Sequence, residues 1–170
     1  MTVVAVTGAR GFRTGEADRA VAIVRRTLTA LEGVTELRTG AQYGVDTAAG
    51  EIGLSAFPKA KHVCIVPSAG HNAGVVDAFE AAKAMRDVQI IRMPDEPDDA
   101  KAYRARNLAM TDGAEMVLAF PSTGEEVTRS GTWMTVRMAR SKDIPLVIVP
   151  LDGADPWVEK GKDGSRRIHA

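Results

Sequence analysis

Residues 38–50 read RTGAQYGVDTAAG and place three glycines and an aspartate between two predicted elements. The residues before this stretch favour a strand, and those from about Asp46 onward favour a helix. An ordinary connection needs one turn residue, whereas Gly40 and Gly44 permit positive φ angles and close approach to the main chain. We interpret the stretch as a strand-to-helix loop that a ligand approaches, although a simple role for Asp46 as a helix N-cap would also explain its position.

Apolar runs rich in β-branched residues alternate along the chain with segments of helical periodicity. The predicted strands cover residues 3–7, 35–39, 63–67, 88–93, 116–120 and 146–150. The predicted helices cover residues 17–31, a segment from about 46, and residues 75–86, 100–112 and 132–141. Continuous apolar strands separated by helices are typical of a parallel sheet covered on both faces. The sequence therefore predicts a doubly wound, Rossmann-like α/β fold, with a mostly parallel sheet of about five to seven strands and helices on both faces.

The chain of 170 residues fits one domain, and 45% of its residues are hydrophobic and available for a core. We expect the Rossmann-like domain to cover residues 1–151. Residues 152–170 differ in composition, and they are expected either to form a hairpin around Lys162-Asp163-Gly164 or to remain a mobile tail.

Lysine plus arginine number 22 and aspartate plus glutamate also number 22, so the chain has no global basic field typical of nucleic-acid binding. This overall balance does not exclude a basic patch on one part of the surface.

The one cysteine, Cys64, lies in an apolar run and is interpreted as a buried, small hydrophobic residue. A single cysteine excludes disulfides within the chain and zinc sites built from several cysteines.

No apolar run approaches the about 20 residues that a membrane-spanning helix needs. The N-terminal residues MTVVAVTGAR have no basic region before the apolar run, so they indicate a strand rather than a signal peptide. We therefore expect a cytoplasmic protein with no membrane partner.

Ligands of doubly wound folds bind beyond the carboxyl ends of the strands, which directs attention to the strand-to-helix loops. TGARGFRTG follows the first strand, and it matches neither the P-loop nor the G-x-G-x-x-G pattern. Its Gly8 and Arg10 would nevertheless present backbone amides and a guanidinium to a phosphate. The ordinary alternative is a flexible turn with a solvated arginine.

Two later segments carry further candidates. YRARN places Arg106 and Asn107 on a partly apolar helical face, where such side chains need partners. RSGTWMT opens a helix, and its free amide groups form an anion site. The predicted ligand-binding residues are Gly8, Arg10, Gly40, Gly44, Asp46, Arg106, Asn107, Ser130, Gly131 and Thr132.

No catalytic residue, metal site or cofactor is predicted. His62 and His71 lack the spacing of metal ligands, and no Ser-His-Asp or Cys-His set can be placed.

The order of these segments carries more information than any one of them. VTGAR, TGAQYGVDTAA, YRARNLAM, VLAFPS, SGTWMTVRMA and DIPLVIVP together resemble the SLOG superfamily of Rossmann-like nucleotide-binding domains, over about residues 3–150. The pattern looks closest to the DNA-processing protein A branch and is more distantly similar to the Lonely Guy phosphoribohydrolases. In the DNA-processing branch, a glycine-rich motif ending in Asp-x-x-Ala matches residues 40–49, an Arg-Asn motif matches Arg106-Asn107, and an SG-[ST]-x-x-T motif matches residues 130–135.

The chain departs from the Lonely Guy pattern PGGxGTxxE, whose glutamate is catalytic. Thr135 stands at the glutamate position, and residues 128–130 replace the PGG. Glu125 and Glu126 are the nearby carboxylates that could substitute for it. The flanking domains of full-length DNA-processing proteins are also missing from this sequence.

Three functions follow from the resemblance. The first is a module that senses or sequesters a nucleotide or another phosphorylated small molecule derived from one, and the missing glutamate favours it. The second is cleavage or transfer at the N-glycosidic bond of a nucleoside monophosphate. The third is single-stranded DNA binding through Arg10, Arg13 and Arg129. The resemblance also implies a homodimer or a higher oligomer.

Overall fold

The computed structural model describes residues 2–68, 75–160 and 168–169, and its strands within these ranges form one sheet. The strands are β1 (Thr2–Gly8), β2 (Val34–Thr39), β3 (Lys61–Val66), β4 (Val88–Arg92), β5 (Met116–Phe120), β6 (Leu146–Ile148), β7 (Trp157–Glu159) and β8 (Ile168–His169). Their order across the sheet is β4-β3-β2-β1-β5-β6-β7-β8. The first six run parallel, and β7 and β8 extend the sheet in antiparallel fashion.

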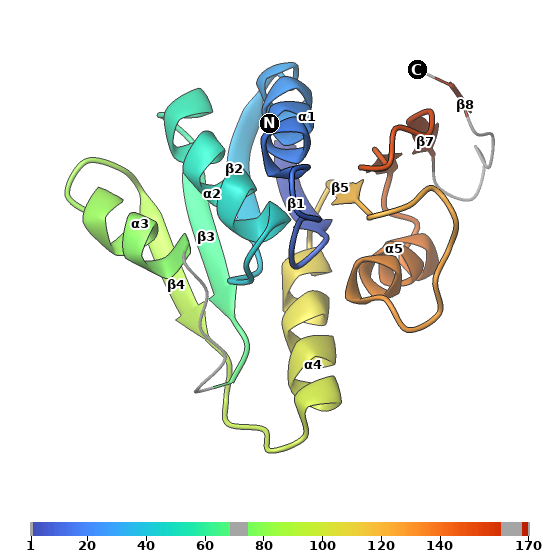
Figure 1. The fold of residues 1–170 in the computed structure, drawn as a ribbon. Helices are drawn as coiled ribbons and strands as arrows, with labels where there is room; N and C mark the ends of the chain where they lie inside the picture. Colours follow the sequence, from blue (N-terminus) through green and yellow to red (C-terminus); the bar gives the residue numbers. More distant parts are fainter. Residues whose placement is uncertain (1, 69–74, 161–167, 170) are drawn as a thin grey trace.

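Helices cover both faces of this sheet. They are α1 (Ala17–Thr29), α2 (Val45–Ala56), α3 (Val75–Ala82), α4 (Asp99–Thr111) and α5 (Gly131–Ser141). Figure 1 shows α1, α2 and α3 lying on one side of the sheet, and α4 and α5 on the other. The predicted doubly wound, Rossmann-like α/β fold is therefore confirmed, with the two-residue β8 lying beyond the seven strands expected at most.

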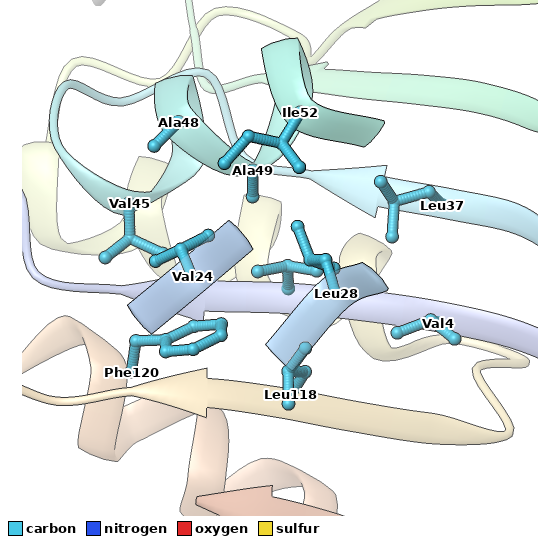
Figure 2. Packing of buried hydrophobic residues seen from close by; sticks show 11 residues of the cluster. Val4, Val24, Leu28, Leu37, Val45, Ala48, Ala49, Ile52, Leu118 and Phe120 are labelled. Atoms are coloured by element: carbon cyan, nitrogen blue, oxygen red, sulfur yellow. The ribbon is translucent and has the colours of Figure 1, made fainter. Parts of the chain in front are cut away.

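Alternation along the central strands separates the two layers of the core. Val4 and Val6 of β1 share one core cluster with Val24 and Leu28, which recur at helical spacing along α1. Figure 2 shows Val4 among the residues of this cluster. Ala5, between the two valines, instead joins the cluster around α5. Strand β5 alternates in the same way, because Leu118 and Phe120 belong to the first cluster while Val117 and Ala119 belong to the second.

The path of the chain creates a topological switch beside β1. From β1 the chain builds β2, β3 and β4 outward in one direction, and α4 then returns it to β5 on the other side of β1. Connections on either side of such a point diverge, which opens a crevice at the carboxyl ends of the two strands. The loops after β1 and β5 therefore border the same crevice.

Several local predictions are corrected or confirmed by the structure. Helix α3 ends at Ala82, and residues 83–86, which were expected to continue it, form a turn in which Met85 N–H donates to the Ala82 carbonyl at 2.9 Å. Cys64 is fully buried as predicted, and burial raises the pKa of its thiol to about 12. No described helix is long and apolar enough to cross a bilayer.

Some expectations concern residues outside the described ranges. The predicted turn at residues 162–164 and His71 both lie there. Strand β7 precedes that turn and β8 follows it, and the two strands pair in antiparallel fashion. His62 lies in β3 and is fully buried, and its Nε2 lies 2.9 Å from the Phe57 carbonyl, so that nitrogen donates the hydrogen bond. Burial lowers the pKa of the His62 imidazole.

A substitution of Leu28 tests the packing of the core cluster that contains Val4, Val24 and Phe120, here called the central core cluster. The Leu28 side chain is fully buried there between α1 and the sheet. Leu28→Ala should lower the free energy of unfolding by about 2–5 kcal/mol through lost burial and a residual cavity. Arg25→Ala, an exposed change on the same helix, should alter it by less than about 0.5 kcal/mol. Urea denaturation measures both, and similar values for the two variants would contradict this packing.

Candidate functional site

A cavity of about 300 Å³ opens at the carboxyl ends of β1 and β5. Eight of the ten predicted ligand-binding residues line it: Gly8, Arg10, Asp46, Arg106, Asn107, Ser130, Gly131 and Thr132. Gly40 and Gly44 do not. Thr7, Gln42, Ser122 and Arg129 also line the cavity. Arg129 belongs to the basic patch predicted for DNA. Ser122 is not among the predicted residues, although it lies in the loop after the predicted strand at residues 116–120.

Helix α5 points its N-terminus at this cavity. Ser130 is the N-cap in extended conformation, and its hydroxyl oxygen accepts from Trp133 N–H at 3.4 Å. The first helical bond runs from Met134 N–H to the Ser130 carbonyl at 2.8 Å. This geometry leaves the amides of Gly131 and Thr132 without an acceptor inside the helix. They present the positive end of the helix dipole to whatever enters the cavity.

Two arginines add positive charge at the same place. A Cβ built on Gly131 would lie 3.6 Å from Arg10 Nη2, which places that guanidinium beside the start of α5. Arg10 also stacks on Tyr103 of α4, with Cζ 4.0 Å from the ring centroid. Arg129 lines the cavity from the loop just before α5 and is exposed. The mouth of the cavity is therefore cationic, and the stacked ring holds one cation in position.

An ion pair forms the interior wall. Arg106 Nη1 donates to Asp46 Oδ2 at 3.0 Å, and the two side chains are only 6% and 4% exposed. Arg106 Nη1 also lies 3.3 Å from the sulfur of Met110. Its Nε is buried and has no hydrogen-bond partner among the described residues. The pair joins α4 to α2 and is more deeply buried than any other ion pair between described side chains.

Burial decides the protonation behaviour of Asp46. Loss of solvent raises the pKa of its carboxyl to about 6, against the charge and hydrogen bond of Arg106, which lower it. Asp46 therefore gains a proton at a higher pH in the folded chain than in the unfolded chain.

The glycines of residues 38–50 make room for the protein's own groups. A Cβ on Gly40 would lie 1.2 Å from Arg106 Nη1, so only glycine lets the guanidinium rest against the main chain there. Gly44 has a φ of 78°, and a Cβ on it would lie 2.3 Å from the Ala9 carbonyl oxygen. The close approach inferred from the sequence is thus real, but at these two positions the partners are Arg106 and the loop after β1.

Asp46 is not the helix N-cap that the sequence suggested. Gly44 occupies that position, and α2 begins at Val45, so Asp46 lies within the first turn. Its carboxylate is turned to Arg106 because burial of an unpaired guanidinium would be costly.

The expected substitute carboxylates lie elsewhere. Thr135, at the position of the Lonely Guy glutamate, is fully buried and donates to the Gly131 carbonyl of its own helix at 3.1 Å. Glu126 forms ion pairs with Arg137 and Arg140. Neither Glu125 nor Glu126 lines the cavity, and Asp46 is the sole carboxylate among its described lining residues. No group of three or more described His, Cys, Asp or Glu side chains is arranged to hold a metal ion.

The sheet order, the two helical layers and the cavity at the switch point define a Rossmann-like α/β domain. DNA processing protein A (DprA) from Streptococcus pneumoniae has a similar structure, with a TM-score of 0.58 and 18% identity over 88% of this chain and 50% of that one. TM1055, a structural genomics target, matches with a TM-score of 0.56 and 18% identity over 86% of this chain and 72% of its own. This chain spans about half the length of the DprA chain. No family model and no curated protein sequence matches it. The likeness confirms the predicted Rossmann-like α/β fold.

Gly40→Ala should break the buried ion pair, because its methyl group would occupy the position of Arg106 Nη1. Separating such a pair leaves uncompensated charge in the interior and should lower the free energy of unfolding by about 3–5 kcal/mol. Gly11→Ala is the matched control, since a Cβ there meets no atom within 4 Å. Chemical denaturation of the two variants measures the difference. Equal stability of the two would show that Arg106 does not depend on Gly40.

The pKa of Asp46 predicts a pH-dependent stability. Because its folded value is raised from 3.8 to about 6, the folded chain binds a proton in this window that the unfolded chain does not. The contribution of Asp46 to the free energy of unfolding should therefore fall by up to about 3 kcal/mol as pH rises from about 4 to 6, and should stay constant above about pH 7. Asp46→Asn lacks this titration, so the wild-type value minus the variant value should follow that curve in urea denaturation. A difference that is flat or that rises with pH would be the contrary result.

Proposed function

We propose that the chain binds a nucleotide or a nucleotide-derived ligand in the cavity between β1 and β5, as a sensing or sequestering module. The observation that carries this proposal is the convergence of three phosphate-binding features on one cavity. These are the amide groups at the start of α5, the Arg10 guanidinium beside Gly131, and Arg129. Such features recur in protein sites for phosphate groups, and they lie here at a topological switch point.

The cavity divides into a phosphate end and a more deeply buried polar end. In this proposal the phosphate lies against Gly131 and Thr132, with the Arg10 guanidinium on its other side. The buried Asn107 and Arg106 side chains then face the sugar.

Binding without turnover is favoured over cleavage of an N-glycosidic bond. Cleavage of this kind requires a group that stabilises positive charge on the sugar or activates water. The carboxylate available in the cavity, Asp46, is occupied by Arg106 at 3.0 Å. The Thr135 hydroxyl is directed into its own helix.

Single-stranded DNA is a second candidate ligand. Arg10, Arg13 and Arg129 are all exposed, and each lines one of two adjoining cavities at the same edge of the sheet. Several exposed arginines at one edge of the sheet suit the repeated phosphates of a single strand. This candidate predicts binding whose affinity falls steeply with salt, with a slope near 0.7 per contacted phosphate on logarithmic axes.

A thermal-shift screen tests the proposal directly. Mononucleotides, dinucleotides, cyclic nucleotides, ADP-ribose derivatives and a short single-stranded DNA should be compared on the wild-type chain. A ligand at about 100 times its dissociation constant should stabilise the fold by about 2.7 kcal/mol, which is readily measured for a domain of this size. At least one nucleotide should raise the melting temperature, and chromatography should recover that nucleotide unchanged.

The double variant Arg10→Ala/Thr132→Val should weaken the binding of that nucleotide by about tenfold or more. It removes one charge-assisted contact and one hydroxyl group. Arg25→Ala removes an exposed arginine from α1 outside the cavity and should leave the affinity unchanged. Retention of full affinity by the double variant would contradict the proposed phosphate site at Arg10 and Thr132. A melting temperature raised by DNA alone would favour the second candidate, and release of free base would establish an enzyme.

A further inference from the structure

A second cavity, of about 130 Å³, adjoins the first one. Ala9 and Ser122, which lie just after the carboxyl ends of β1 and β5, line both cavities and form a shared boundary, here called the ridge. The loop after β1 and the start of α1 form one wall of the second cavity, and Leu151 and Asp152 form another. Neither Asp46 nor Arg106 lines this second cavity.

The ridge between the cavities is firmly held. Ala9 N–H donates to the Phe120 carbonyl at 3.0 Å, and the Ala9 carbonyl accepts from Val45 N–H at 3.0 Å. Gly44 packs directly against the same carbonyl oxygen. Both hydrogen-bonding groups of Ala9 are therefore used within the protein. A ligand that occupies both cavities therefore contacts Ala9 and Ser122, which line both of them.

The two cavities differ in chemistry. Phe12, Leu151 and Ala20 give the second cavity apolar walls, and the Phe12 ring is partly buried against the central core cluster. The exposed residues Arg13 and Glu16 also line it. Asp152 also lines it, but both carboxylate oxygens accept backbone hydrogen bonds, from Gly124 N–H at 3.1 Å and from Ala154 N–H at 3.0 Å.

We infer that the second cavity holds the base of the same ligand whose phosphate lies in the first cavity. An aromatic side chain with aliphatic neighbours suits the face of a heteroaromatic ring, and one exposed cation and one exposed carboxylate in the lining suit its polar edge. The ligand class is therefore a nucleoside phosphate, rather than a phosphorylated sugar or an inorganic phosphate. This inference rests on the proposed function, because it assigns the other end of a ligand anchored at Arg10 and α5.

Isothermal titration calorimetry with matched ligands separates the two cavities. Ribose 5-phosphate carries the sugar and phosphate without a base, and the four ribonucleoside 5′-monophosphates add one. At least one nucleotide should bind the wild-type chain about tenfold more tightly than ribose 5-phosphate, the gain expected from stacking one base on an aromatic side chain.

Variants then locate that gain. Phe12→Ala should remove most of the preference for the nucleotide while leaving the affinity for ribose 5-phosphate unchanged. Leu31→Ala is the matched control, because Leu31 packs on the same core cluster and lines neither cavity. Gly11→Leu is an independent variant that adds bulk at the cavity wall, where a Cβ meets no atom within 4 Å. It should act in the same direction, so the test does not depend on the folding of Phe12→Ala.

The outcomes distinguish this inference from the function on which it rests. Equal affinity of the wild-type chain for ribose 5-phosphate and for all four nucleotides would overturn the base site alone. Equal weakening of both ligand classes by Gly11→Leu would do the same. Failure of every ligand to bind would overturn the proposed function and the inference together.

Discussion

The buried ion pair between Asp46 and Arg106 is the constraint on which the candidate site depends. It joins residues 60 positions apart in the chain and ties α2 to α4 beneath the central cavity. A pair of this kind adds little net stability, but each partner would be costly to bury alone. The surrounding chain has adapted to it, since Gly40 leaves space for the guanidinium and Met110 covers it with sulfur. The interior wall of the cavity is therefore rigid and polar.

The mouth of the cavity is organised differently. Arg10 and Arg129 are exposed, and the free amides at the start of α5 face the same space. Asp46 is the sole carboxylate among the described residues that line this cavity, and Arg106 balances its charge. A formally neutral chain thus concentrates an uncompensated positive field in one crevice. A rigid interior and a cationic mouth together favour a small anionic ligand with a polar sugar, which is the basis of the proposed function.

Much of the fold could be predicted from the sequence because its signals are local. Apolar runs and helical spacing marked the six parallel strands and the five helices, and glycine-rich loops marked the carboxyl ends of the strands. Eight of the ten predicted residues line one cavity because parallel strands bring those ends to a single edge. The misplaced end of α3 reflects weak local signals, since residues 83–86 continue a helical composition but form a turn.

By itself, the sequence determined the alternation of strands and helices, the loops worth searching and the absence of a global basic field. Only the tertiary structure decided what the glycines of residues 38–50 face. Gly40 meets Arg106, and Gly44 meets the Ala9 carbonyl, both contributed by distant segments. It also turned Asp46 from an expected helix cap into the partner of a buried guanidinium. Hydrophobic patterns with periods of two and 3.6 residues specify local strand or helix conformation. The partner of a side chain depends instead on which segments the sheet order brings together.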